Sequence, residues 1–456
     1  MFAPRAPADS KILLKSISIT EIRVVFCSLL LLLSSVLSQI WELFGLYAIL
    51  TAIGSFLSPV LGATLWFLPA PFEAVTVTKA DFSPYLAITP AFLGGVFLHA
   101  IRHPRYRFQL LPFTFSLGFI TAGLLSVMLS NNISGIRNLI SIGLLAMCTV
   151  AGISAVSNEP RKAYLILAGA ILSATGAAIF AILQWEGGWR LSLTQDWGGG
   201  VRHLDTSVSI AIAICISLLL YGKKFLNDVT SARPPKFQNY RKTLQVIVLF
   251  LLLVLLATVS RGAIAALVFG LILIGLSYGT LALLSGRLPK HISIIVFSFL
   301  IVVFFAPVLD QLISRGHIIS RTMLMLQEPG ENARWLIWSN AIGSLQGWEW
   351  VFGAGLGSFR ELADAGPHSL YISALVEIGV IGFMFVFLLS IVAGISGQKK
   401  AGLPFLMFFS FFLFSFLTKG SLYNKYFYFS FVIASALAVT APSKKSRQIE
   451  KSITHR

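Results

Sequence analysis

The chain has 456 residues, of which 56% are hydrophobic and only 12% are charged. Apolar runs of eighteen or more residues recur along it, which excludes a soluble globular protein and predicts an all-α polytopic membrane protein. The net charge of +17 does not indicate nucleic-acid binding, because the basic residues gather in short loops and at both ends of the chain. That distribution is the one the positive-inside rule gives to cytoplasmic segments.

The chain begins with a basic segment, 1–23, which is predicted to be cytoplasmic. The apolar stretch 24–76 comes next and is too long for one span and awkward for two. Because both ends of the chain are predicted in the cytoplasm, the number of spans is even. We therefore expect about twelve transmembrane helices, or fourteen if 24–76 forms three short ones.

The transmembrane region 24–309 is followed by one long loop, 310–367, by C-terminal spans within 368–441 and by a basic cytoplasmic tail, 442–456. The spans after residue 76 are predicted at 83–100, 110–129, 138–156, 163–183, 207–221, 243–260, 263–284, 292–309, 369–394, 403–417 and 426–441.

The charges of the loops predict their sides. The segment 222–242 has six basic residues and one acid, so it is placed in the cytoplasm, as are the basic loops "IRHPRYR" and "SNEPRK". The loop 310–367 has six acids and four arginines and is predicted to be extracytoplasmic, with short helices of its own. The segment 184–206 and the turn Ser260–Gly262 fall on the same side.

Within the long loop, "ENARWLIWSNAIGSLQ" has apolar residues every three to four positions, which predicts an amphipathic helix on or near the membrane. Asn332 could cap this helix, and Arg334 would lie in its first turn. A helix N-terminus is an unfavourable place for a cation unless an anion binds there. A glycine-rich turn, "VFGAGLGSF", follows.

Four cationic or titratable residues share the predicted outer face: Arg202, Arg261, Arg334 and His368. Arg261 could simply reach the lipid headgroups, or it could be a fixed cation at the floor of an external cavity. Three arginines and a histidine at one cavity suit a substrate that carries phosphates, because guanidinium pairs with phosphate oxygens. No acidic cluster in the first outer loop offers a metal site, so we expect neither a metal nor a cofactor.

Four stretches of the chain together resemble the bacterial O-antigen ligase and repeat-unit polymerase superfamily, best over 184–394. In chain order they are "SRGA", the Arg334 helix, "GAGLGSF" and "PH..Y...L.E.G.IG". The resemblance implies a GT-C-like membrane glycosyltransferase of the bacterial inner membrane, with its active site facing the periplasm. Such an enzyme moves a glycan from an undecaprenyl-diphosphate donor to lipid A–core, to another lipid-linked repeat unit or to a protein hydroxyl.

The resemblance also implies roles for single residues. Arg261, Arg334 and, more loosely, Arg202 would bind the diphosphate, and His368 would act with Arg261 in catalysis. Family members usually have asparagine after this histidine, where the chain has Ser369.

Two alternatives to an enzyme are a transporter or flippase of a lipid-linked glycan and a structural scaffold of an envelope complex. A transporter would be expected to show inverted repeats and broken helices at mid-membrane depth. Glu377 lies nine residues after His368, about 13 Å along a helix. We expect it to pair with another helix rather than to take part in catalysis.

Overall fold

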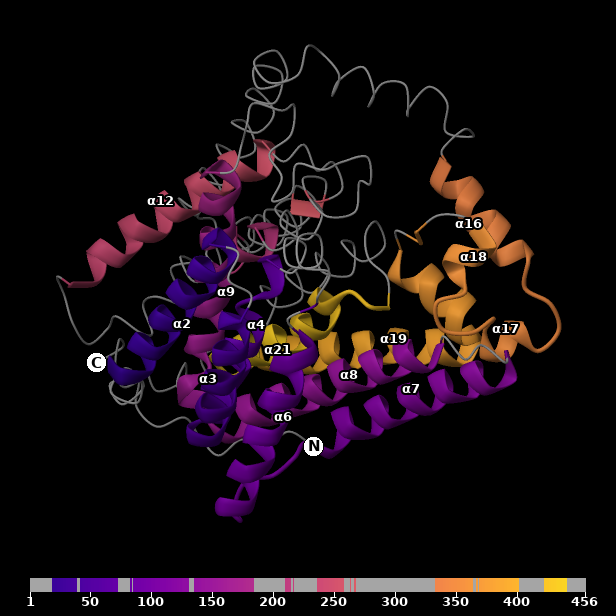
Figure 1. Cartoon of the computed structure of the whole chain (residues 1–456), viewed down its shortest axis with the longest axis horizontal. Coiled ribbons are helices and arrows are strands. Elements are labelled where there is room, and N and C mark those ends of the chain that lie inside the picture. Colours follow the sequence, from indigo (N-terminus) through magenta and orange to yellow (C-terminus); the bar gives the residue numbers. More distant parts are fainter. Residues whose placement is uncertain are drawn as a thin grey trace, which may run out of the picture.

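The structure is a computed structural model that describes residues 19–38, 42–72, 83, 85–130, 135–183, 210–214, 216, 236–257, 263, 266–267, 333–363, 366–367, 369–401 and 422–440. All secondary structure in these ranges is helical (Figure 1). Within these ranges, five stretches are long and apolar enough to cross a membrane: α6 (Tyr85–Arg102), α7 (Leu110–Leu129), α8 (Gly135–Asn158), η2 with α9 (Pro160–Leu183), and Leu370–Ile391 of α19 (Leu370–Ala401).

These helices confirm the all-α membrane class. The total number of spans and the GT-C-like arrangement stay predictions, because the predicted spans 207–221, 263–284, 292–309 and 403–417 lie wholly or largely outside the described residues. The remaining helices are α2 (Ile19–Ser38), α3 (Leu43–Leu57), α4 (Pro59–Phe67), η1 (Ala70–Phe72), α12 (Lys236–Ala257), α16 (Ala333–Gly343), α17 (Glu349–Phe352), α18 (Phe359–Ala363) and α21 (Lys425–Thr440).

The stretch 24–76 forms three α-helices, α2, α3 and α4, followed by the short η1. A sharp corner at Ser58 separates α3 from α4, where the Ser58 side chain accepts from the Leu61 amide and Pro59 takes the first helical position. Gly62 lies so close to Ser55 that a Cβ there would overlap it, so α3 and α4 fold back on each other. All nine residues of α4 are buried, and a helix of that length, about 14 Å, does not cross the bilayer alone.

Helices α3 and α6 pack side by side and run in the same direction. Gly95 of α6 lies against Ala52 and Ser55 of α3, and one turn further along both helices Nδ1 of His99 donates to the Phe56 carbonyl oxygen at 2.7 Å. The absence of a side chain at Gly95 lets the two backbones approach closely, as is common between membrane helices. Both helices therefore end at the same end of the molecule.

Helices α8 and α21 also run in the same direction. Thr149 contacts the Tyr428 carbonyl oxygen at 3.5 Å, and Gly152 lies against Val432 one turn later. The end of α8 is joined to the loop after α6, because the Asn158 side-chain amide donates to the Arg107 carbonyl oxygen at 2.8 Å. Helices α6, α8 and α21 thus end together.

Helix α7 starts at that end and runs antiparallel to α19. Gly118 of α7 lies against Phe385 of α19, and Gly123 lies near Ile378. The start of α19 and the short helices α16, α17 and α18 are therefore at the opposite end of the helices, as Figure 1 shows on its right side. The helix contacts therefore place the loop 103–109 and residues 333–363 at opposite ends of the helices, as the loop charges predict. Which end faces the cytoplasm stays a prediction.

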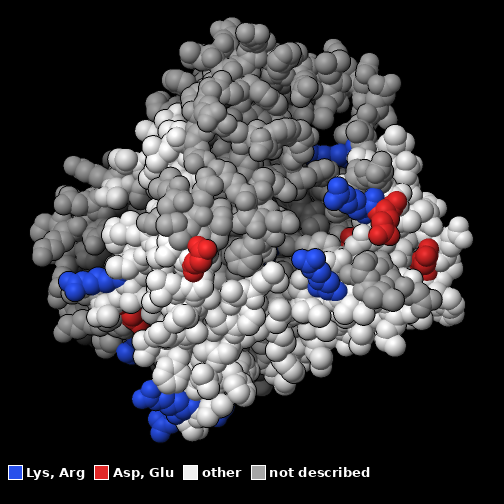
Figure 2. Space-filling model, in the orientation of Figure 1, with Lys and Arg blue, Asp and Glu red and all other residues white. Residues whose placement is uncertain are grey.

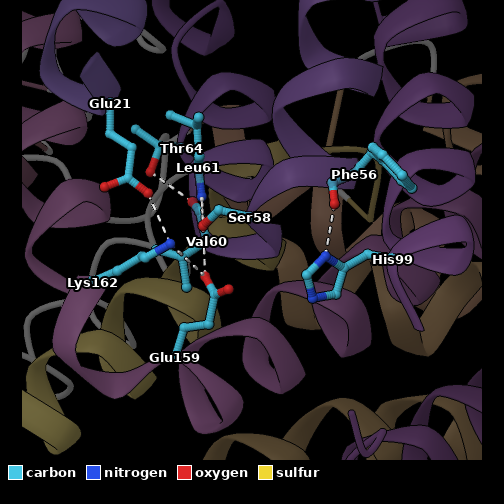
Figure 3. A network of polar contacts seen from close by, with 9 residues as sticks. All are labelled: Glu21, Phe56, Ser58, Val60, Leu61, Thr64, His99, Glu159 and Lys162. Atoms are coloured by element: carbon cyan, nitrogen blue, oxygen red, sulfur yellow. Dashed lines mark hydrogen bonds and ion pairs between the residues drawn. The ribbon is translucent and has the colours of Figure 1, made fainter. Parts of the chain in front are cut away.

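A polar network ties the helices together at the end where α6 and α8 finish (Figure 3). The Ser58 hydroxyl donates to Glu159 Oε2 at 2.6 Å. Lys162 Nζ lies 2.8 Å from Glu21 Oε1 and 3.8 Å from Glu159 Oε2. Lys162 thereby joins the start of α2 to the connection between α8 and α9, and Glu159 joins that connection to the α3–α4 corner.

The two ends of the molecule also differ in charge. Arg102, the last residue of α6, and Arg105 and Arg107 in the loop after it are all exposed. Figure 2 shows Lys and Arg side chains gathered at that end of the molecule. Around α16–α18, basic and acidic side chains occur together. Cations gathered at one end of the described helices are the distribution expected of a membrane protein whose loops follow the positive-inside rule.

Candidate functional site

Of the four residues predicted to share one outer cavity, the structure describes Arg334. It lies in the first turn of α16 and is partly buried, so the predicted helix and the position of this arginine in it are confirmed. Arg202, Arg261 and His368 lie outside the described residues, and so does the expected cap Asn332. That these side chains meet in one site stays a prediction.

Helix α16 packs on α19 with one face and exposes apolar side chains on another. Ala341 of α16 is fully buried in a small cluster with Leu345, Phe359 of α18 and Val376 of α19. Trp335 is 65% and Leu336 61% exposed. Large exposed apolar side chains beside the end of a membrane helix are typical of the lipid–water interface, where tryptophan is enriched.

The chain around His368 is held on both sides. Before it, the Pro367 carbonyl oxygen accepts a hydrogen bond from Nε1 of Trp338 at 2.6 Å. Trp338 lies four residues after Arg334, so the two project from the same face of α16. The same helix face that carries Arg334 is therefore attached to the residue that precedes His368.

After His368, Ser369 immediately precedes α19. Its hydroxyl accepts from the Ile372 amide at 3.4 Å, and its carbonyl oxygen accepts from the Ser373 amide at 3.0 Å. Ser369 is thus the N-cap of α19, a position that favours serine and asparagine about equally.

Helix α19 is broken at Gly379, whose φ of 69° and ψ of −172° are not helical. The break leaves carbonyl oxygens of the preceding turn without partners inside the helix. Ala354 N donates to the Val376 carbonyl oxygen at 2.8 Å, and the Ser126 hydroxyl donates to that of Glu377. Partners from outside the helix are what a break at membrane depth requires, because lipid offers none.

The glycine-rich turn 353–358 lies directly on this break. Gly353, Gly355 and Gly357 all have positive φ values, of 84°, 104° and 92°, a region that side-chain-bearing residues rarely adopt. A Cβ on Gly353 would overlap the backbone of Glu377, and a Cβ on Gly379 would overlap the backbone of Val351. Glycine is needed on both sides, because the two backbones touch.

Replacing Gly379 with alanine should therefore reduce the amount of folded protein severely. The conformation alone costs of order 1–3 kcal/mol for a residue with a side chain, and the overlap with α17 adds to it. Gly347 is the matched control, because its φ is also positive, at 52°, but nothing lies within 4 Å of a Cβ there. Thermal unfolding of both variants checks the prediction, and equal stabilities would show that the contact is unimportant.

Glu377 is 2% exposed and lies at the centre of a hydrogen-bonded group. Tyr423 Oη donates to its Oε2 at 2.7 Å, and the Gly357 backbone and the Ser373 side chain lie next to its carboxyl group. We call these four residues the Glu377 cluster. Its members come from α19, from the glycine-rich turn and from the residues just before α21, which agrees with the expected pairing of Glu377 with another part of the helical core.

Tyr423 and Lys425 were not among the residues predicted from the sequence to have a functional role. Nζ of Lys425 lies 4.4 Å from the centre of the Tyr85 ring. A signal was present, because "TKGSLYNKYFYFS" places a lysine at the start of an apolar run, and charged residues inside membrane segments are rare and often functional. Among the described residues, no group of three or more His, Cys, Asp or Glu could hold a metal ion; metal-independent chemistry stays a prediction.

The fold and the site define a class: an integral membrane protein, helical throughout its described secondary structure, in which a broken helix supports a glycine-rich turn and a small helical unit. This unit consists of α16–α18 and is predicted to lie on the outer side, so we call it the outer unit. A family model described as O-antigen ligase matches residues 246–387, a segment that contains α16, the glycine-rich turn and the break in α19. This match confirms the resemblance to the O-antigen ligase and polymerase superfamily and indicates a function of that type. A search of curated proteins finds no match to the chain.

Proposed function

We propose that this protein is a glycosyltransferase of the bacterial inner membrane that uses an undecaprenyl-diphosphate-linked glycan as donor. Its acceptor lies on the extracytoplasmic face, and the reaction is either ligation to lipid A–core or polymerisation of repeat units in surface polysaccharide assembly. The observation that carries the proposal is the O-antigen ligase match over residues 246–387. This segment includes Arg261, Arg334 and His368.

The proposed reaction is one displacement at the anomeric carbon of the donor sugar. The acceptor hydroxyl oxygen bonds to that carbon, the bond from the carbon to the phosphate oxygen breaks, and His368 accepts the proton of the hydroxyl. The lipid diphosphate leaves with the bonding electron pair. Arg261, Arg334 and Arg202 would stabilise its charge, a role that fixed cations can fill without a metal ion.

The structural support for this mechanism is the anchoring of Arg334 and of the chain at His368 to one unit. Trp338 lies one turn after Arg334 and donates to Pro367, while Ser369 starts a rigid helix immediately after His368. Preorganised charges are effective in catalysis because they need no reorganisation during the reaction. A transporter of the same donor would have to release it again, and the family match does not favour that alternative.

The deciding experiment uses the purified protein in lipid nanodiscs with a radiolabelled lipid-linked glycan as donor. The acceptor is lipid A–core in one reaction and excess lipid-linked glycan in another. We expect a product with a new glycosidic bond and the release of undecaprenyl diphosphate. The acceptor that gives product distinguishes ligase from polymerase. Movement of the donor between leaflets of a proteoliposome without bond formation would instead identify a flippase.

The sidedness of the site gives a separate prediction. Gln346 is exposed between α16 and α17, so cysteine placed there, in a variant without the native cysteines, should react with an impermeant reagent in cells whose cytoplasmic membrane is intact. Arg105, exposed in the loop after α6, provides the matched position, and its cysteine should react only after permeabilisation. The reverse pattern would place the outer unit in the cytoplasm and exclude the proposed reaction site.

A further inference from the structure

We propose that Glu377 and Tyr423 are positioning residues for the transfer reaction. These two residues join the glycine-rich turn to α19 and to the start of α21. In this way they fix the position of α16, which carries Arg334, and of the chain at His368 relative to the membrane helices. This inference rests on the proposed function, since it names residues that act through the proposed site without contacting the substrate.

The first step of the argument is the cost of placing a carboxyl group here. Glu377 is almost completely buried in a predicted membrane span, where an ionisable side chain is unfavourable unless it is fully hydrogen-bonded. The structure provides a close donor to this carboxyl group, Tyr423 Oη at 2.7 Å, and the glycine-rich turn packs on the backbone of the same residue at Gly353. Such a group persists only where it holds those segments in a required arrangement or takes part in function.

The second step is that a carboxylate suits this surrounding better than other side chains. The Glu377 carboxyl group can accept from the Tyr423 hydroxyl in either protonation state, because one of its oxygens stays an acceptor. Glutamine in the same place would keep one acceptor oxygen and replace the other oxygen with an NH₂ group. An alanine would leave the Tyr423 hydroxyl without this partner, which destabilises the arrangement because a buried polar group has lost its hydrogen bond.

The third step follows the contacts from the Glu377 cluster to the outer unit. Gly357 belongs to the turn that also donates from Ala354 N to Val376 O at 2.8 Å. Directly after this turn, Phe359 is fully buried against α16 and against Val376. The turn thus adds to the direct packing of α16 on α19 in determining the position of α16. The Trp338–Pro367 bond continues that connection to the residue before His368.

The fourth step concerns α21. Ser373 of the cluster accepts from the Leu422 amide at 3.4 Å, and the Leu422 carbonyl oxygen accepts from Tyr428 at 3.0 Å. The residues before α21 are therefore bound to α19 at two points, Tyr423–Glu377 and Leu422–Ser373. Because α21 packs along α8, the cluster connects the outer unit to the deepest part of the helical core.

The test compares Glu377→Ala, Glu377→Gln and Tyr423→Phe, each purified and brought to equal amounts of folded protein. We expect turnover to fall about 10- to 100-fold in Glu377→Ala, because small displacements of reacting groups have effects of that size. Glu377→Gln should recover part of the activity and Tyr423→Phe should lose less than Glu377→Ala. The double variant Glu377→Ala/Tyr423→Phe should have the same turnover as Glu377→Ala, since both changes remove the same hydrogen bond. The pH dependence should not move, because the cluster transfers no proton.

Hydrogen exchange gives a readout that does not depend on activity. Amides of residues 353–358 should exchange faster in Glu377→Ala and Tyr423→Phe than in the wild type. The matched control is Tyr47→Phe, which removes another buried phenol bond, the one from Tyr47 Oη to the Leu65 carbonyl oxygen between α3 and α4. It should lower stability without changing turnover per folded molecule or exchange in 353–358.

Wild-type turnover in folded Glu377→Ala would overturn the inference, as would faster exchange in 353–358 with unchanged turnover, because the cluster would then be only structural. If Glu377→Ala does not fold, Tyr423→Phe decides by the same two measurements. If the wild type forms no glycosidic bond at all, it is the proposed function that fails. In that case the exchange measurement still shows whether the cluster holds the turn.

Discussion

Replacing His368 with alanine is expected to abolish glycosyl transfer while donor binding remains largely intact. A neutral imidazole can accept the proton of the acceptor hydroxyl as the glycosidic bond forms, and loss of a general base typically costs about 10²–10⁴-fold in rate. Turnover and donor affinity of the purified variant are the measurements. His103, an exposed histidine in the loop after α6, supplies the control, and His103→Ala should leave both values unchanged.

The pH dependence separates this role from that of a diphosphate ligand. A base works only in its neutral form, so activity should rise as pH increases through the pKa of the histidine, near 6.5 when unperturbed. Nearby arginines would favour the neutral form, because they disfavour a second cation. A histidine that bound the diphosphate as a cation would instead lose activity with rising pH. Parallel loss of donor binding and turnover in His368→Ala would assign His368 to the diphosphate site with the arginines.

Replacing Arg261 with alanine is expected to reduce the rate about 10²–10³-fold, the usual effect of removing one preorganised electrostatic donor. Arg261→Lys should restore little, because an ammonium cannot reproduce the paired hydrogen bonds of guanidinium to two phosphate oxygens. Turnover with a lipid-linked donor measures both variants. If folded Arg261→Ala keeps nearly full activity at every salt concentration, this arginine only reaches the lipid headgroups.

Arg105→Ala is a suitable control for this experiment, since Arg105 is an exposed arginine in the loop predicted on the opposite side. It should leave turnover unchanged while removing the same charge from the protein. A loss of activity in Arg105→Ala equal to that in Arg261→Ala would mean that net charge, rather than a cation at the diphosphate, determines the rate.

The positions of several membrane helices could be predicted from the sequence. The predicted spans 83–100, 110–129, 138–156 and 163–183 correspond to α6, α7, α8 and α9, with ends that differ by at most three residues. The reason is that lipid cannot hydrogen-bond a polypeptide backbone, so an apolar run of about twenty residues has to form a helix. The helix that carries Arg334 was predictable for a similar local reason, the spacing of its apolar residues.

The candidate site depended on the tertiary structure. Hydropathy is the same for a straight and a broken helix, so "LVEIGVIG" does not show that α19 changes direction at Gly379. The break persists because Ala354 and Ser126 supply donors to its freed carbonyl oxygens, and Ser126 is 251 positions away from Glu377 in the sequence.

The same distinction applies to the partners of Glu377 and to the stretch 24–76. From the sequence alone it follows that a carboxyl group buried in an apolar run needs a hydrogen-bond donor, and that 24–76 is too long for a single span. The identity of the donor, Tyr423, 46 residues further along the chain, follows only from the fold. The same is true of the turn at Ser58 that leads from α3 into the buried helix α4. Composition and periodicity indicate whether a residue faces lipid, water or protein, and they depend only on its neighbours along the chain. The polar partner of a residue inside the membrane depends instead on how distant segments pack together.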